Sequence, residues 1–284
     1  MVALEAGTFA GYRVLDLTTG QCALAARLLG DLGADVIKVE PPQGDPLRQE
    51  GPFYRGQPHP DRSLHFWAYN TNKRGVTLDL RAPAGREVFL RLVALADVVI
   101  ESFPPRGMTS LGLGEEVLRR AHPDVVVASI TAFGQTGPRA HYLAPDLVGQ
   151  AMGGLMYITG DRDRQPVRIS FPQAYLHAAG EAAVGTAMAL YHRGRTGEGQ
   201  HVDVSMQQAV AWTLMDATVT WDINRINIAR GGALRDDPRG GPVLRLNWPC
   251  KDGHVTFTLG GGVTYGPSTQ ALVQWMAEED MAPD

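Results

Sequence analysis

The sequence predicts an α/β fold built on a parallel sheet. Short apolar runs that suit buried strands recur along the chain, and stretches with apolar residues at helical spacing separate them. Turns rich in Gly and Pro lie between the two kinds of segment. Strands that alternate with helices in this way form right-handed βαβ units, whose strands run parallel in one sheet.

The first βαβ unit occupies residues 12–45. The apolar run at 14–17 suits a buried strand, and apolar residues then recur at helical spacing across 23–32. Gly33 fits the left-handed position that follows a helix end. Residues 35–39 form a second strand-like run, so this part of the chain has the complete order strand, helix, strand.

The carboxyl ends of these two strands, residues 18–22 and 40–45, are the expected ligand edge, because ligands of open parallel sheets bind there. The first turn reads TTGQCA and contains Gly20 alone. It lacks the GxGxxG pattern that lets a pyrophosphate approach the backbone. NAD or FAD binding is therefore disfavoured, and a generic α/β sheet is the simpler interpretation.

The second βαβ unit has strands at 76–80 and 98–100 and a helix that begins near Pro83. Lys73 and Arg74 stand just before its first strand. Adjacent cations in such a turn either hold an anionic ligand or form an exposed basic pair. The residues alone leave both interpretations open.

Further elements follow along the chain, and the composition then changes. After a short helix at 115–120 we expect, in order, a strand at 125–130, a Gly-containing helix at 146–160, an Ala-rich helix at 174–192, a strand at 201–204 and a helix at 205–226. Residues 228–242 are rich in Gly, Arg, Asp and Pro, which is typical of a linker. Strands at 243–248 and 254–259 and a helix at 268–276 then indicate a second, smaller domain.

Composition excludes several classes of function. A chain of 284 residues with 44% hydrophobic and 20% charged residues is ordinary for a soluble globular protein with a substantial core. The net charge of -4 argues against a nucleic-acid partner. The only cysteines are Cys22 and Cys250, so we expect no disulfide framework and a cytoplasmic location. No apolar stretch reaches the length of a membrane span, and we expect neither a membrane partner nor a signal peptide.

Several common catalytic motifs are absent from the sequence. The eight histidines are scattered, and none stands at a metal-ligand spacing such as HExxH, so we expect no metal site. The chain also lacks a GxSxG elbow and a GxxxxGK[ST] loop. The residue patterns by themselves therefore predict an α/β protein with a ligand at a sheet edge.

Six segments together resemble those of the family III CoA-transferases, the CaiB/BaiF family. They are RVLDLTTGQCA, LGADVIKVEPPQGDPLR, NKRGVTLDL, ADVVIESFPPRGM, SITAFGQTGP and RGRTGEGQHVDVSM, and they stand in the family's order between Tyr12 and about Arg230. The resemblance implies a Rossmann-like large domain, here residues 1–226, a linker at 227–242, and a smaller α+β domain. Residues 243–284 would be the start of that domain, which would be incomplete, and two protomers would interlock like links of a chain.

The resemblance also implies a binding site for coenzyme A or an acyl-CoA, which would be a co-substrate with no metal. CoA carries several phosphate charges, so under this interpretation the basic pair would bind anions. The implied contacts are Thr19, Gly20, Gln21, Cys22, Lys73, Arg74, Ser102, Phe103, Ser110, Leu111 and Thr131.

The catalytic position departs from the family pattern. In these transferases an Asp in a P-x-x-D motif attacks the thioester and becomes an acyl anhydride; here Pro172 is followed by Tyr175 at the Asp position. A phenol with a pKa of about 10 is only about one part in a thousand ionised at neutral pH, which costs roughly 4 kcal/mol. The family's racemase branch is disfavoured as well, because its His would fall at Pro145, which cannot move a proton.

One type of family member accounts for a missing Asp. Transferases of aromatic succinates, such as succinyl-CoA:benzylsuccinate CoA-transferase, look like pairs of homologous subunits of which one lacks the Asp. The expected function is therefore the non-nucleophilic subunit of a heteromeric CoA-transferase that moves CoA between carboxylic acids. The alternatives are a non-catalytic CoA-binding protein and a homomeric transferase with a displaced nucleophile.

Overall fold

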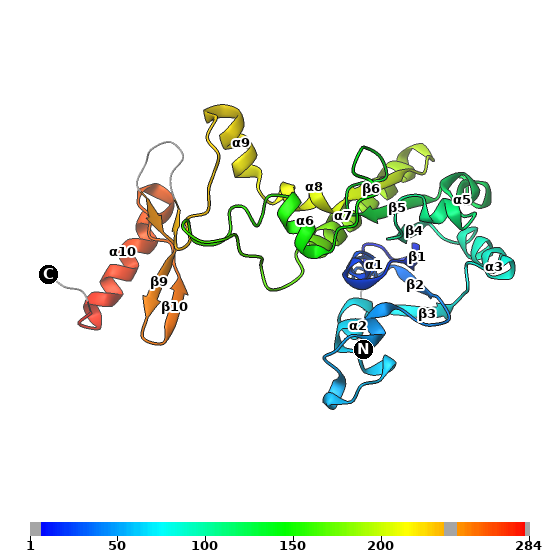
Figure 1. Ribbon diagram of the computed structural model, residues 1–284, viewed down its shortest axis with the longest axis horizontal. Coiled ribbons are helices and arrows are strands. Elements are labelled where there is room, and N and C mark those ends of the chain that lie inside the picture. The colour runs from blue at the N-terminus through cyan, green and yellow to red at the C-terminus, as the bar shows by residue number, and fades with distance from the viewer. Residues whose placement is uncertain (1–6, 236–242, 282–284) are drawn as a thin grey trace. The chain divides into compact units, whose positions relative to one another are not determined.

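The computed structural model describes residues 7–235 and 243–281, which form two compact units (Figure 1). The first unit contains the chain up to Gly154 together with Ile169–Thr213. The second contains Leu155–Arg168 and the chain from Leu214 onward. The expected linker at 227–242 lies partly outside the described residues, and the domain boundary at 226 stays a prediction.

A six-stranded parallel sheet forms the centre of the first unit, which confirms the predicted α/β class. Its strand order is β3-β2-β1-β4-β5-β6, the order of the Rossmann fold, in which the direction of winding reverses between β1 and β4. The strands are β1 (Arg13–Leu17), β2 (Asp35–Glu40), β3 (Lys73–Thr77), β4 (Val98–Glu101), β5 (Val126–Thr131) and β6 (His201–Ser205).

The first strand of the second βαβ unit begins earlier than the sequence indicates. β3 starts at Lys73, whereas the expected strand began at residue 76. Lys73 pairs with Val36 and Arg74 with Ile37, so both cations lie within the sheet edge and not in a turn before it. The polar composition of KRGVT hides this strand, because β3 is an edge strand whose outer side faces solvent.

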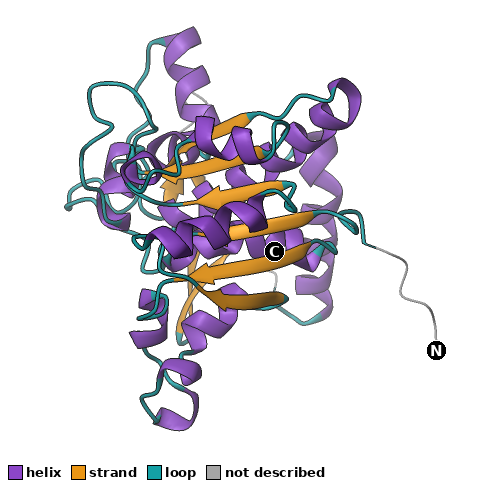
Figure 2. Ribbon diagram, turned by 90° about the vertical axis from the view of Figure 1, so that its right-hand side faces the viewer, coloured by secondary structure: helices purple, strands orange, loops and turns teal. Residues whose placement is uncertain are grey.

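Helices cover both faces of the sheet (Figure 2). On one face, α1 (Leu24–Asp31) packs against α7 (Ala174–Thr196), and the buried side of α7 consists mainly of alanines, which allow the helix to lie close to the strands. On the other face, α3 (Pro83–Val93) and α5 (Glu115–Ala121) contribute Phe89, Val93 and Leu118 to a core that includes Leu15 and Leu17 of β1.

Small residues position the amino end of α7. At Gly149 in α6 (Asp146–Met152), a Cβ atom would lie 2.7 Å from the Cβ of Ala174. At Gly153 it would lie 2.5 Å from Val210 of α8 (Met206–Trp212), so both glycines permit a close approach of neighbouring side chains. α6 ends at Met152 and not at 160, because Gly153 and Gly154 follow, the latter with a φ of 92°.

The expected helix at 205–226 is two helices, α8 and α9 (Met215–Asn224), and these belong to different units. The second unit also contains the two strand pairs β7 (Leu234–Arg235) with β8 (Leu244–Arg245) and β9 (Asn247–Cys250) with β10 (Gly253–Thr256), and α10 (Gly262–Glu278). The first unit has two further short helices, α2 (Leu64–Asn70) and α4 (Gly107–Ser110). Among the described residues, no helix combines the length and apolarity needed to cross a bilayer.

Candidate functional site

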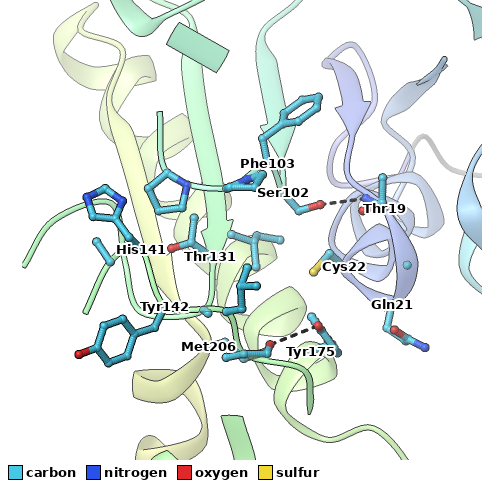
Figure 3. A pocket seen from close by; sticks show the side chains of 18 of the residues that line it. Thr19, Gln21, Cys22, Ser102, Phe103, Thr131, His141, Tyr142, Tyr175 and Met206 are labelled. Carbon is cyan, nitrogen blue, oxygen red and sulfur yellow. Dashed lines mark hydrogen bonds between the residues drawn. The ribbon is translucent and has the colours of Figure 1, made fainter. Parts of the chain in front are cut away.

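Two clefts lie at the carboxyl edge of the sheet, both within the first unit. The central cleft, of about 520 Å³, lies between the turns after β1, β4 and β5, residues 140–144 and the start of α7 (Figure 3). The lateral cleft, of about 920 Å³, lies between the turns after β1, β2, β3 and β4. Thr19 and Phe103 line both clefts and so form the wall between them.

Most of the residues implied as CoA contacts meet at these clefts. The tertiary structure brings them together from turns that are far apart in the sequence. The central cleft is lined by Thr19, Gly20, Gln21, Cys22, Ser102, Phe103 and Thr131, together with Tyr175, and the lateral cleft by Thr19, Phe103, Ser110 and Leu111.

A hydrogen bond joins the turns after β1 and β4. The backbone N–H of Thr19 donates to the Oγ of Ser102 over 2.9 Å (Figure 3). Beyond Thr19 the chain makes a 3₁₀ turn, Gly20–Ala23, which Gly20 enters with a φ of 61°. Glycine reaches this left-handed conformation at little cost, so the turn can lie directly against the cleft.

Lys73 and Arg74 line neither cleft, and each contacts a carboxylate. The Lys73 side chain is only 1% exposed, and its Nζ donates to Asp16 Oδ2 at 2.7 Å, with two further acceptors within 2.9 Å. Arg74 Nη2 donates to Asp35 over 2.6 and 2.7 Å. The Lys73 ammonium therefore has no proton left to donate to a CoA phosphate, whereas the Arg74 side chain is 66% exposed but lines neither cleft.

Lys73 belongs to a buried ionic cluster beneath the turn after β1. Lys38 Nζ lies 3.0 Å from Asp45 Oδ2 and 3.8 Å from Asp16 Oδ2, and it also donates to the carbonyl oxygen of Thr18. Burial opposes ionisation of Asp16, but the charges of Lys38 and Lys73 outweigh it and hold the Asp16 pKa below its usual value. The cluster thereby holds the turn that carries the wall between the clefts.

Tyr175 lies at the first turn of α7, and its phenol donates to the carbonyl oxygen of Ala144 over 3.4 Å (Figure 3). Burial raises the pKa of this phenol, and Cys22 and Asp146 raise it further. Burial also raises the pKa of the Cys22 thiol to about 12. Neither side chain is therefore an effective nucleophile at neutral pH.

Glu50, Thr131 and His141 also line the central cleft. Glu50 is exposed, and it is the only carboxylate that lines this cleft within the described part of the chain. Thr131 is only 6% exposed, and its hydroxyl has no hydrogen-bond partner among the described residues. An unpaired buried hydroxyl in a cleft is unusual in folded proteins, and a bound ligand is one way to satisfy it.

Charges around the lateral cleft are largely paired. Arg48 donates to both carboxylate oxygens of Glu40, at 2.6 and 2.8 Å, and so neutralises this buried acid. Lys38 is paired with Asp45 and Asp16. Arg81 is different, because it is exposed and its guanidinium contacts no carboxylate of the described residues. The sequence offered a weak signal for it, a cation that follows a strand near its carboxyl end.

Comparison with known proteins decides the family. A family model described as CoA-transferase family III matches residues 9–284. The chain belongs to CoA-transferase family III.

This family III chain is similar to several curated proteins. It is 41% identical over 271 residues, or 95% of the chain, to "Succinyl-CoA:(R)-benzylsuccinate CoA-transferase subunit BbsE" of Thauera aromatica, and it spans 64% of that protein. It is 35% identical over 88% of its length to succinyl-CoA:glutarate CoA-transferase of Mus musculus and spans 56% of it. A CaiB/BaiF family protein from Brucella suis has a similar structure, with 30% identity, a TM-score of 0.82, and coverage of 98% of this chain and 71% of that one.

Asp146 is a functional-site neighbour that sequence reasoning missed in this family III chain. Its Oδ1 accepts from the backbone N–H of Ala174 at 2.8 Å, and its Oδ2 accepts from Gln150 Nε2 at 2.5 Å. The carboxylate thus binds the first N–H of α7 and holds the turn that carries Tyr175. Asp146 does not line the central cleft, and the signal available in the sequence was its spacing of four residues from Gln150.

Metal ligands do not cluster at this edge of the sheet. Among residues 7–235 and 243–281, no group of three or more His, Cys, Asp and Glu side chains is arranged so that it could hold a metal ion. The expectation of a site without a metal stays a prediction.

Proposed function

We propose that this chain binds a CoA thioester at the two clefts and takes part in the transfer of CoA between carboxylic acids. The observation that carries the proposal is that seven residues that the family resemblance implies as CoA contacts line the central cleft together, Thr131 with its unpaired hydroxyl among them. Under this proposal the thioester end of CoA occupies the central cleft and the nucleotide end the lateral cleft.

The proposed phosphate ligand is Arg81 in place of Lys73 and Arg74. Arg81 lines the lateral cleft and its guanidinium is exposed, so its donors are available for phosphate oxygens. Lys73 and Arg74 instead keep structural roles in their ion pairs with Asp16 and Asp35.

We further propose that a homologous subunit supplies the carboxylate. In the transfer, a carboxylate oxygen bonds to the thioester carbonyl carbon and CoA leaves as a thiolate. The thiolate then displaces the donor acid from the resulting anhydride and forms an enzyme–CoA thioester, from which a second carboxylic acid takes over the CoA. Tyr175 is poorly suited to this step, because its pKa is raised and its acyl product is an unactivated ester. A relative that is 41% identical is named as a subunit, which supports a heteromer.

The acid substrate proposed is an aromatic one. Three aromatic residues, Phe103, Tyr142 and Tyr175, line the central cleft, and Tyr142 is 60% exposed. An aromatic acid would cover this apolar surface. The benzylsuccinate named for the similar relative is an acid of this kind. The interlocked dimer and the cytoplasmic location stay predictions.

Substitution of Thr131 tests the CoA site. Thr131→Val should weaken CoA binding, measured by calorimetry, by roughly five- to tenfold, because the variant loses one hydrogen bond in a buried site. The control is Thr186→Val, since Thr186 is also buried with an unpaired hydroxyl but lines neither cleft. Unchanged CoA binding by Thr131→Val would contradict the proposal.

The heteromer is tested by purification of the chain alone and with a homologous protein encoded next to it. We expect CoA transfer from succinyl-CoA only in the joint preparation. Full activity of the chain alone would instead favour a displaced nucleophile, for which Glu50 is the candidate because it lines the central cleft. Mass spectrometry of trapped acyl-enzyme and the variant Glu50→Gln would then locate it. CoA binding without transfer in either preparation would indicate a binding protein.

A further inference from the structure

A third, smaller cleft of about 170 Å³ lies near the end of β4 and contains a chain of hydrogen-bonded side chains. Ser129 Oγ lies 3.0 Å from His201 Nε2, and His201 Nδ1 lies 3.3 Å from Glu115 Oε2. Ser129 is also the register partner of Glu101 on the neighbouring strand. These four side chains come from β4, β5, β6 and α5, so only the packing of the sheet and α5 brings them together.

Glu101 connects this chain to the wall between the two larger clefts. It is 3% exposed, and its Oε2 accepts from the backbone N–H of Phe103 over 2.6 Å. Phe103 lines both the central and the lateral cleft, and its neighbour Ser102 accepts from Thr19. Glu101 itself lines neither of these two clefts, so its charge acts on them through its hydrogen bond with Phe103.

We propose that Glu101 is a positioning residue whose ionised form holds Phe103 against the two clefts. The consequence for CoA rests on the proposed function. An ionised carboxylate accepts a stronger hydrogen bond from the Phe103 N–H than a neutral one does. CoA should therefore bind more tightly at a pH where Glu101 is ionised.

Charged groups on every neighbouring element act on this carboxyl. Asp203 of β6 opposes its ionisation, and Arg106, Glu115 and His201 line the same small cleft. Burial is the largest effect, and with Asp203 it raises the Glu101 pKa to about 7, against the lowering effect of Ser129 and the Phe103 N–H. The charge of Glu101 thus changes close to neutral pH.

The first test needs no ligand. NMR should show the amide of Phe103 titrating with a midpoint near pH 7 in the wild-type chain, and Glu101→Gln should abolish this titration. Ser129→Ala should move the midpoint upward, because its hydroxyl lowers the Glu101 pKa. Glu116→Gln is the control, since Glu116 is an exposed acid on the same helix as Glu115. A Phe103 amide that does not titrate, or that titrates unchanged in Glu101→Gln, would overturn the positioning role of Glu101.

The second test measures CoA affinity from about pH 6 to about pH 8. We expect the Kd of the wild-type chain to fall by roughly fivefold over this range, as a charge-assisted hydrogen bond replaces a neutral one. Glu101→Gln should bind CoA with a Kd that does not change with pH. A pH dependence retained in that variant would refute the coupling to the clefts. Absence of CoA binding at any pH would refute the proposed function and the coupling, while the Phe103 titration still decides whether Glu101 positions Phe103.

Discussion

Removal of the Asp16 charge should destabilise the first unit strongly. Asp16 is fully buried, with Lys73 Nζ at 2.7 Å and Lys38 Nζ at 3.8 Å from its Oδ2. At an effective dielectric constant of about 20 these attractions are worth roughly 6 and 4 kcal/mol before desolvation is counted. Removal of the charge also relieves the desolvation of Asp16, so the expected net cost of Asp16→Asn is about 3–5 kcal/mol.

The measurement is urea unfolding, with hydrogen exchange of the β1 amides to assign the transition to the first unit. The second variant, Asp16→Asn with Lys73→Met, should recover part of the loss, because it leaves the pair of Lys38 and Asp45 balanced. The control is Asp31→Asn, whose pair with Arg27 is exposed and should contribute less than about 1 kcal/mol. A cost below about 1 kcal/mol for Asp16→Asn would refute the assignment of this cluster as structural.

The pH dependence gives a further check on the same residue. Because the Asp16 pKa is lowered in the folded chain, its stabilisation is present above the unfolded pKa and is lost as the pH falls through the folded value. The variant Asp16→Asn should therefore show a smaller loss of stability below about pH 4 than the wild-type chain shows.

Three other predictions concern separate features. Arg81→Gln should raise the Kd for CoA roughly tenfold and reduce the salt dependence of binding. The control is Arg91→Gln, which replaces an exposed arginine of α3 and should leave both quantities unchanged. Equal effects of the two variants would exclude Arg81 as a phosphate ligand. Gly149→Val should cost about 1–3 kcal/mol of unfolding free energy, because the valine side chain has no room against α7. Gly180→Ala should instead stabilise the chain by roughly 0.5–1 kcal/mol, because Gly180 has open space around it and alanine favours the helix. Urea unfolding of both variants separates the effect of crowding from that of helix propensity. Glu101 has a raised pKa, so its ionisation makes folding less favourable as the pH rises from about 4.5 to about 7. Glu101→Gln should remove this loss of stability, which is worth up to about 3 kcal/mol. Parallel curves of stability against pH for the variant and the wild type would contradict this prediction.

Sequence patterns located most elements of the sheet and the turns at its carboxyl edge. The runs at 14–17, 35–39 and 98–100 correspond to β1, β2 and β4, because buried strands of parallel sheets are apolar. β3 began earlier than expected, since an edge strand with polar residues has no such pattern. The helix expected at 205–226 proved to be two helices, because its apolar residues recur with nearly helical spacing across the break between α8 and α9.

The sequence by itself determined the order of strands and helices, the turns that meet at the ligand edge, and the absence of an Asp at the position of Tyr175. Only the tertiary structure decided that Lys73 pairs with Asp16, that the Thr131 hydroxyl has no partner among the described residues, and that Asp146 holds the start of α7. The physical reason is the range of the interactions. Helix and strand patterns depend on neighbouring residues, whereas burial, ion pairing and hydrogen-bond satisfaction depend on residues that only the folded sheet brings together.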